Sequence, residues 1–416
     1  MRAEAPAATP GSDPSLSLYR LLDQEVLADP YPLYRRLRTE DPVHWDPFLH
    51  AWVVTQYADV VTVLYRFSAS RTPAPEQLAA MGLETLTPLA RVLVKQMLFL
   101  DGEAHGRMRG LAAHAFTPRR VAVLREHIEE ITSRLLDAAA QRGSMDVVAD
   151  LGAPLPAIVT AEMLGVPSED HAQLKNWSAD FAEVLGNFQH NPDHAARMLR
   201  TTNAMSEYFR DRIREQRRQP REGLINALLT AEIDGDRLSE EEIVANCIIT
   251  MVGGQETTTN LIGNGVLALL RHPDQLARLR ADLSLVPSAV EELLRFEPPT
   301  QHTARLAPED LTMGGRLLKK RQAVIAVIGA ANRDPERFAD PDRLDVGRAD
   351  NRHLAFGWGP HFCFGAPLAR IEGQTAFAML LARFSHIELE PGPLVWRQNL
   401  ALRGLERLPV RLRSAA

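Results

Sequence analysis

Cysteine is scarce in this chain: Cys247 and Cys363 are the only two among 416 residues. Two thiols exclude a disulfide framework and every zinc site that needs three or four thiolates. Each cysteine therefore has to be considered singly. One of them can be retained for its reactivity, or both can be small residues of the core.

An excess of basic charge and long apolar runs are also lacking. The chain has 47 Lys and Arg against 53 Asp and Glu, a formal net charge of −6, which argues against binding nucleic acid by neutralising phosphates. Its strongest apolar run, Ala323–Ala331, is strand-sized and well short of the about 18 residues of a membrane span. The segment Arg2–Ser15 is rich in Ala and Pro and has no signal-peptide core. We expect a cytoplasmic protein without nucleic-acid or membrane partners, whose residues 1–15 form a flexible tail.

The composition and periodicity predict a folded, mainly helical protein. Hydrophobic residues make up 45% and charged residues 24%, so a sizeable core is expected. Apolar residues recur at helical spacing over Arg119–Arg218, whereas Pro42–Tyr57 alternates as a hairpin does and Leu311–Ile328 is strand-rich. Leu400–Leu412 is expected to add another hairpin. No flexible linker interrupts the chain, so we predict one domain over residues 16–416, mainly α with a small β part (α+β).

A long buried helix is predicted from Ser239 to Arg271. Ser239–Glu242 has the pattern of a capping box, and no proline follows before Pro273. At ~1.5 Å per residue the helix is about 50 Å long, enough to cross a domain. Its first half is apolar on most sides, which is typical of a buried helix.

Polar residues and glycines interrupt this helix over Gly253–Asn260. The hydroxyl of Thr257 lies four residues after Gly253 and competes for that residue's carbonyl, which bends or widens the turn. One interpretation is a kink packed against another helix. The other is a ligand site, because the two glycines leave room and Glu256 beside Thr257 is suited to passing protons to a bound molecule.

Cys363 stands in a glycine-rich loop, Phe356–Gly365, directly before a helical run over Ala366–Phe384. The free N–H groups and positive end of that helix favour a thiolate. Three interpretations remain open: a core cysteine, a nucleophile with His361 as its base, or the single thiolate ligand of a planar cofactor.

The loop resembles the haem-binding loop of the cytochrome P-450 family. Every fixed position of that family's pattern is filled, by Phe356, Gly359, His361, Cys363 and Gly365. Other segments resemble the family in the right order, and together they cover nearly all of the chain after the tail. Gly253–Thr257 is similar to the oxygen-binding groove, with Gly253 where alanine is more common. Glu292 and Arg295 match the Glu-x-x-Arg pair, and Asn332–Pro335 resembles the segment before the haem loop.

The resemblance implies a cytochrome P-450 fold that holds haem b between the long helix and the helix after the cysteine loop. Cys363 is then the axial ligand of the iron, and Gly365 lets the porphyrin lie close. The remaining implied cofactor contacts are His105, Arg109, Gly253, Gly254, Arg305, Phe356 and His361, of which His105, Arg109, Arg305 and His361 would hold the propionates. Glu292 and Arg295 are the implied structural pair, and whether Arg343 or Arg348 joins them is left open.

The implied activity is that of a monooxygenase that hydroxylates or epoxidises a hydrophobic small molecule with O2, in natural-product biosynthesis or catabolism. Glu256 and Thr257 are the implied catalytic residues, because they deliver protons during oxygen cleavage. No flavin or iron–sulfur segment is visible, so electrons from NAD(P)H are expected through a separate ferredoxin and ferredoxin reductase, with a monomeric enzyme. The alternatives are a non-catalytic haem-binding sensor or carrier, or a cytochrome P-450 with a non-monooxygenase reaction.

The family's pocket-forming segments carry mostly apolar residues in this chain. The resulting candidates for the substrate pocket are Leu86, Val94, Ile249, Val252, Thr300, His302 and Leu400. Among them, His302 is the candidate polar anchor. Candidate contacts for the redox partner are Arg107, Arg119 and Arg120.

Overall fold

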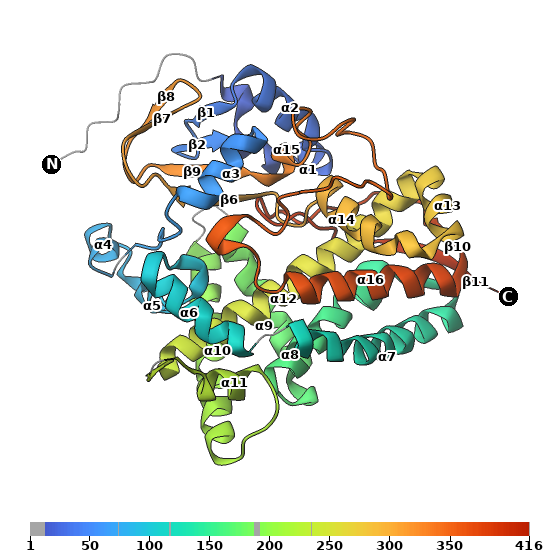
Figure 1. Ribbon diagram of the computed structural model, residues 1–416, viewed down its shortest axis with the longest axis horizontal. Helices are drawn as coiled ribbons and strands as arrows, with labels where there is room; N and C mark the ends of the chain where they lie inside the picture. Colours follow the sequence, from blue (N-terminus) through green and yellow to red (C-terminus); the bar gives the residue numbers. More distant parts are fainter. Residues whose placement is uncertain (1–12, 74, 116–117, 187–191, 234, 416) are drawn as a thin grey trace.

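The computed structural model describes residues 13–73, 75–115, 118–186, 192–233 and 235–415, and Figure 1 shows its arrangement. The described chain is mainly helical with a small β part, which confirms the predicted fold class. The helices are α1 (Gln24–Ala28), α2 (Tyr31–Glu40), α3 (Tyr57–Arg66), α4 (Pro75–Ala80), α5 (Thr87–Leu93), α6 (Gly102–Ala115), α7 (Pro118–Arg142), α8 (Pro154–Leu164), α9 (His171–Gly186), α10 (Pro192–Arg218), α11 (Leu224–Thr230), α12 (Glu240–Arg271), α13 (Pro273–Ala281), α14 (Val286–Phe296), α15 (Ile328–Ala331) and α16 (Ala366–Arg383). Part of the expected tail, residues 1–12, lies outside the description, whereas Pro14–Leu16 forms a 3-10 turn that Asp13 caps.

A four-stranded sheet gathers at one end of the molecule, with the helices α2, α3 and α15 (Figure 1). Its order is β1-β2-β9-β6, in which β2 and β9 are parallel and the other neighbours antiparallel. The strands of the structure are β1 (Val43–Asp46), β2 (Ala51–Val54), β3 (Ser144–Asp146), β4 (Glu232–Ile233), β5 (Asp236–Arg237), β6 (His302–Leu306), β7 (Leu311–Met313), β8 (Arg316–Leu318), β9 (Ala323–Val327), β10 (Phe384–Leu389) and β11 (Pro409–Ser414). The hairpin predicted over Pro42–Tyr57 and the strands predicted over Leu311–Ile328 are confirmed.

The prediction of a hairpin over Leu400–Leu412 is wrong, because the strand in this segment pairs with other parts of the chain. The strand β11 pairs with β10 and with β3 rather than with the segment that precedes it. The preceding residues instead make the single bridges Thr300 to Leu402 and Trp396 to Leu405. Strands from distant parts of the chain supply the missing backbone partners, which periodicity within one segment cannot reveal.

The helix α12 forms as predicted and crosses the middle of the molecule (Figure 1). Its capping box is complete: the Ser239 hydroxyl accepts from the Glu242 N–H at 3.3 Å, and the Glu242 carboxylate accepts from the Ser239 N–H at 2.8 Å. The helix packs against α8, α9, α10, α14 and α16. A buried helix with this many neighbours provides a rigid base for side chains that face a cavity.

Two apolar cores meet along α12. Residues from Ile243 to Val252 pack in one core with α9, α10 and α11, and residues from Leu261 to Leu269 pack in the other with α14 and α16. The polar stretch Gly253–Asn260 therefore lies between two apolar anchors. Cys247 is fully buried in the first core, where burial raises the pKa of its thiol, so this cysteine is a small core residue.

One segment has the length and hydropathy of a membrane helix. The window Val147–Leu164 has a mean hydropathy of 1.5. It is a π-helical turn, Val147–Gly152, followed by α8, and its side chains Leu151, Leu155 and Val159 pack in the core beside α12. In this structure the segment is therefore part of the protein core.

Glu292 and Arg295 form a buried pair, not the weak surface pair that their spacing alone would suggest. Both side chains are 0% exposed, and their two hydrogen bonds measure 2.7 and 2.8 Å. Arg348 adds its Nε at 3.1 Å from Glu292 Oε2, whereas Arg343 contributes its backbone carbonyl to Arg295. The Asn332 carbonyl also accepts from Arg295. This network ties α14 to the chain that leads into the cysteine loop.

We predict that Glu292→Gln lowers the free energy of unfolding by about 3–5 kcal/mol, because it leaves the Arg295 charge buried without its partner. Urea unfolding of the haem-loaded protein measures the change. The matched control is Asp211→Asn, which breaks the exposed pair with Arg214 and should cost no more than about 1 kcal/mol. Equal losses for the two variants would contradict the assigned role of the network.

Candidate active site

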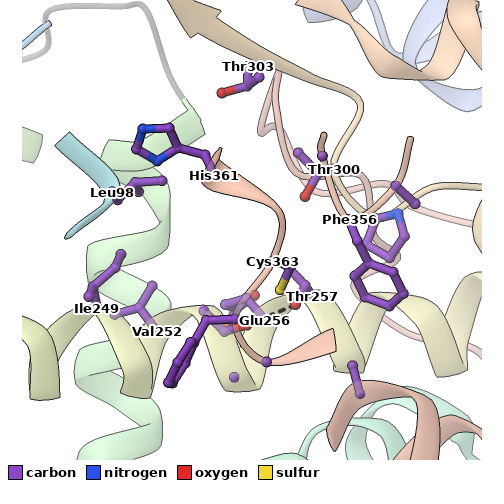
Figure 2. A pocket seen from close by; sticks show the side chains of 18 of the residues that line it. Leu98, Ile249, Val252, Glu256, Thr257, Thr300, Thr303, Phe356, His361 and Cys363 are labelled. Carbon is purple, nitrogen blue, oxygen red and sulfur yellow. Dashed lines mark hydrogen bonds between the residues drawn. The ribbon is translucent and has the colours of Figure 1, made fainter. Parts of the chain in front are cut away.

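A large cavity lies between α12, the cysteine loop and α16 (Figure 2). Together with its mouth it encloses about 1850 Å³ of empty space. The structure brings most of the predicted site residues onto its wall: His105, Arg109, Ile249, Val252, Gly253, Gly254, Glu256, Thr257, Thr300, His302, Arg305, Phe356, His361, Cys363 and Gly365. These residues come from α6, α12, β6 and the residues just before it, and the cysteine loop up to the first residue of α16.

Three predicted pocket residues do not line this cavity. Leu86 ends a 3-10 turn, Val94 is 37% exposed after α5, and Leu400 packs in the core beneath the four-stranded sheet. The walls nearest to them are instead formed by Met97, Leu98, Ala401 and Leu402. Neighbouring residues line the cavity instead, because in an irregular segment neither spacing nor propensity determines which side chain faces inward.

Positive backbone φ angles shape the cysteine loop. Gly357 and Gly359 have φ of 73° and 70°, a region that favours glycine. A methyl group on Gly359 would also lie 2.6 Å from a Tyr65 ring carbon, so α3 packs directly on this turn. The Cys363 N–H donates to the Phe356 carbonyl at 2.8 Å, which closes the loop and orients the sulfur. Gly365 has open space where a Cβ would be, so it leaves the cavity wall flat.

The predicted preference of Cys363 for the thiolate is wrong for the chain alone. Burial raises the pKa of the Cys363 thiol, and the N–H groups of Gly365 and Ala366 together with the charge of Arg109 only partly oppose it. A metal cation deprotonates a coordinating thiol, so this sulfur is suited to a metal. His361 is not placed as its base, because its ring lies against the His105 ring, with centroids 4.2 Å apart and planes tilted by 36°, and points away from the sulfur (Figure 2).

Arginine and histidine side chains also line the cavity. His105 and Arg305 are 5% and 4% exposed, and His105 Nε2 and Arg305 Nε have no hydrogen-bond partner among the described residues. Burial, with the nearby charges of His105 and Arg305, lowers the pKa of His361 to about 4. Arg109 donates to the Phe362 carbonyl at 2.7 Å. Buried donors without acceptors are costly, so this wall fits a ligand that brings carboxylates, as the haem propionates would.

The hydrogen bond predicted between Thr257 and Gly253 in α12 is present. Thr257 Oγ1 donates to the Gly253 carbonyl at 2.8 Å, and a methyl group on Gly253 would meet nothing within 4 Å. Gly254 is different, because a methyl group there would lie 2.6 Å from Thr160 Oγ1 on α8. Both interpretations of the glycine pair therefore hold, one for each residue: Gly253 opens the cavity and Gly254 lets two helices touch.

The sequence analysis missed three polar residues near this turn and at the cavity wall. Arg397 donates through Nη1 to Glu256 at 2.7 Å and through Nη2 to Asn260, from a segment more than a hundred residues further along the chain. Glu372 lines the cavity fully buried on α16, where burial raises the pKa of its carboxyl to about 8. Arg71 lines the cavity as well. No local pattern marks these residues, because each acquires its role through contacts distant in sequence.

A cysteine just before a helix, a glycine that leaves the wall flat and buried donors without partners fit a haem-thiolate protein. The cytochrome P450 family model matches residues 76–395, and the chain belongs to this family. It is 42% identical to the cytochrome P450 monooxygenase PikC of Streptomyces venezuelae, over 97% of this chain and 96% of that protein. It is 39% identical to the biotin biosynthesis cytochrome P450 of Bacillus subtilis, over 93% and 97%.

A solved structure agrees closely. P450BioI, in complex with an acyl carrier protein ligated to hexadec-9Z-enoic acid, superposes with a TM-score of 0.88 at 36% identity, covering 94% of this chain and 99% of that one. The chain is therefore a bacterial-type cytochrome P450 monooxygenase with the family's fold and haem iron.

We predict opposite effects for the two glycines of α12. Gly254→Ala should lower the free energy of unfolding by about 1–3 kcal/mol, because the methyl group collides with Thr160. Gly253→Ala should be neutral or raise it by up to about 1 kcal/mol, because it removes glycine from a helix interior and meets open space. Thermal unfolding of the haem-loaded variants measures both. The reverse order would contradict the placement of the two residues.

His302 should make stability depend on pH. Burial lowers its pKa to about 4, so below the unfolded value of about 6.5 the unfolded chain takes up a proton that the folded chain does not. The stability is full above pH 6.5 and falls as the pH drops towards 4, by about 2 kcal/mol between pH 7 and pH 5. Urea unfolding of wild type and His302→Gln at both pH values isolates this contribution.

The exposed His386 offers the matched control. His386→Gln should keep the pH dependence of the wild type, whereas His302→Gln should lose about 2 kcal/mol of it. Identical pH dependence in wild type and His302→Gln would disprove the buried neutral state of His302.

Proposed function

We propose that this cytochrome P450 hydroxylates or epoxidises a hydrophobic small molecule, with the Glu256–Thr257 turn of α12 handling the protons. The observation that carries the proposal is one cavity in which this turn, the sulfur of Cys363 and an apolar wall occur together. Figure 2 shows Glu256 and Thr257 on α12 and Cys363 on the loop that lines the same space.

The cofactor contacts are proposed residue by residue. Cys363 would bind the iron, and Phe356 and Gly365 would lie beside the ring. His105, Arg109, Arg305 and His361 would hold its carboxylates. When bound, haem with a cysteine ligand supplies the activation of O2 and its O–O cleavage.

Thr257 and Glu256 have the geometry for proton transfer. The Thr257 hydroxyl is held by its bond to the Gly253 carbonyl, and its oxygen remains available as an acceptor. The Glu256 carboxylate lies at the cavity wall and is paired with Arg397, whose side chain is partly exposed to solvent. A proton can therefore pass from solvent to the Glu256 carboxylate and on, through water, to the cavity.

The substrate is proposed to be hydrophobic. The cavity wall includes apolar side chains from four separate segments, among them Leu64, Met97, Leu98, Ile249, Val252 and Leu402. His302 would be the polar anchor, and Thr300 lies beside it at the wall. P450BioI is complexed with an acyl chain on a carrier protein, which supports an acyl-like substrate, free or carrier-bound, in a biosynthetic pathway.

The electron supply is proposed to be NAD(P)H through a ferredoxin and its reductase, acting on a monomer in the cytoplasm. Of the predicted partner contacts, Arg107 is already paired with Asp236 and with Glu242 at 2.7 Å, so its charge is used within the chain. The side chains of Arg119 and Arg120 lie outside the described residues.

One domain over residues 16–416 is proposed because the larger core joins residues from Leu27 to Val410.

The test measures product formed per NAD(P)H oxidised with a surrogate ferredoxin and reductase, on an apolar compound that shifts the haem spectrum. Thr257→Ala should lower this ratio about tenfold or more and raise hydrogen peroxide, because the hydroxyl that positions the proton at the cavity wall is lost. Thr257→Ser, which keeps the hydroxyl, should retain most of the coupling. An unchanged ratio in Thr257→Ala would contradict the proposed proton path.

Thr259→Ser provides a control on the same helix, because Thr259 bonds to the Gln255 carbonyl and is not on the cavity wall. All these variants should keep the red-shifted spectrum of the reduced, carbon monoxide-bound protein. Cys363→Ala should lose it, and a wild type without that band would remove the haem-thiolate assignment altogether.

A further inference from the structure

Arg71 is a cavity residue that the cofactor contacts proposed above do not use. In the chain it lies between Ser68, which forms a single bridge with Leu306 of β6, and α4. It lines the cavity together with His105, Arg305 and His361. Two contacts hold its guanidinium in place. Nη1 donates to the Ala69 carbonyl at 3.2 Å, and the group lies 4.4 Å from the centre of the Phe99 ring.

The nearest acid does not neutralise Arg71. Asp101 accepts from the Ser68 hydroxyl at 2.6 Å and from the N–H groups of Ala69 and Ser70 at 2.9 and 3.2 Å. Its one recorded ion pair is with His361, at 3.7 Å. Within the described part of the chain, no carboxylate lies at ion-pair distance from Arg71.

Arg71 and Arg305 therefore face one cavity with little opposing charge. Burial and the charge of Arg305 lower the pKa of Arg71 to about 9, and burial lowers that of Arg305 to about 10. Both remain cations at neutral pH. Like charges in a poorly solvated site repel, and an anion bound between them removes that cost.

We infer that Arg71 binds a carboxylate inside the cavity, as a further contact beside Arg305 and His361. The carboxylate comes from a haem propionate or from an acidic substrate, and the position of Arg71 among the proposed propionate contacts favours the propionate. The planar fork of a guanidinium suits a two-point bond to a carboxylate. This inference rests on the haem assignment of the proposed function and is independent of the proton path through Glu256 and Thr257.

The first experiment measures haem release from the loaded protein to excess apomyoglobin. Arg71→Met keeps an apolar stem against Phe99 and removes the charge, so release should speed up about five- to a hundredfold. Arg71→Lys, which keeps the charge and loses the fork, should fall between wild type and Arg71→Met. The control Arg66→Met, on an exposed arginine 4.0 Å from Glu309, should release haem at the wild-type rate.

Haem dimethyl ester separates binding from a purely structural effect. It fills the same cavity but carries no carboxylates, so wild type and Arg71→Met loaded with it should release it at equal rates. If Arg71→Met still released the ester faster than wild type by the same factor as haem, Arg71 would be supporting the cavity wall, and the inference would be overturned.

The second arm tests a substrate carboxylate with hexadecanoic acid and hexadecan-1-ol as probes, titrated by the change in the haem spectrum. If Arg71 binds a substrate acid, wild type should bind the acid at least about tenfold more tightly than the alcohol, and Arg71→Met should abolish that preference. A carboxylate-dependent change in either arm supports the inference, and no such change in both arms overturns it. Neither readout depends on turnover, so failure of the proposed oxidation would be recognised separately.

Discussion

The apolar packing of both ends of α12 is the constraint on which the site depends. Its first half is anchored in the core formed with α9, α10 and α11, and its second half in the core formed with α14 and α16. Between these anchors, Gly253–Asn260 cannot move away from the cavity, although its glycines and threonines are poor helix formers. Burial of the flanking apolar surface therefore stabilises a polar turn at the cavity wall, where the proposed proton transfer requires it.

The electrostatics of the cavity are complementary to a ligand, not to the chain itself. The thiol of Cys363 has a raised pKa in the protein alone, and His105 Nε2 and Arg305 Nε have no hydrogen-bond partner among the described residues. A cofactor that brings a metal cation to the sulfur and carboxylates to the cations relieves both. The groups proposed to hold the cofactor are thus those whose burial is costly without it.

Local sequence signals predicted the elements whose stabilising contacts lie within a few residues. The capping box of Ser239 and Glu242, the hairpin of β1 and β2, and the bond from Thr257 to the Gly253 carbonyl are all of this kind. The predictions that failed depend on distant partners. Leu86, Val94 and Leu400 lie in irregular segments whose inward-facing side chains are decided by packing, and the partner of β11 comes from elsewhere in the chain.

Local patterns in the sequence were enough to locate the residues proposed to carry the chemistry: one cysteine just before a helix within a glycine-rich loop, and an acid and an alcohol in a buried helix. The tertiary structure alone decided the pairing of Glu256 with Arg397, the burial of Glu292 with Arg295 and Arg348, and the presence of Arg71 at the cavity wall. The physical reason is that charge pairing, desolvation and steric contact depend on distance in space, which spacing along the chain does not encode between remote segments.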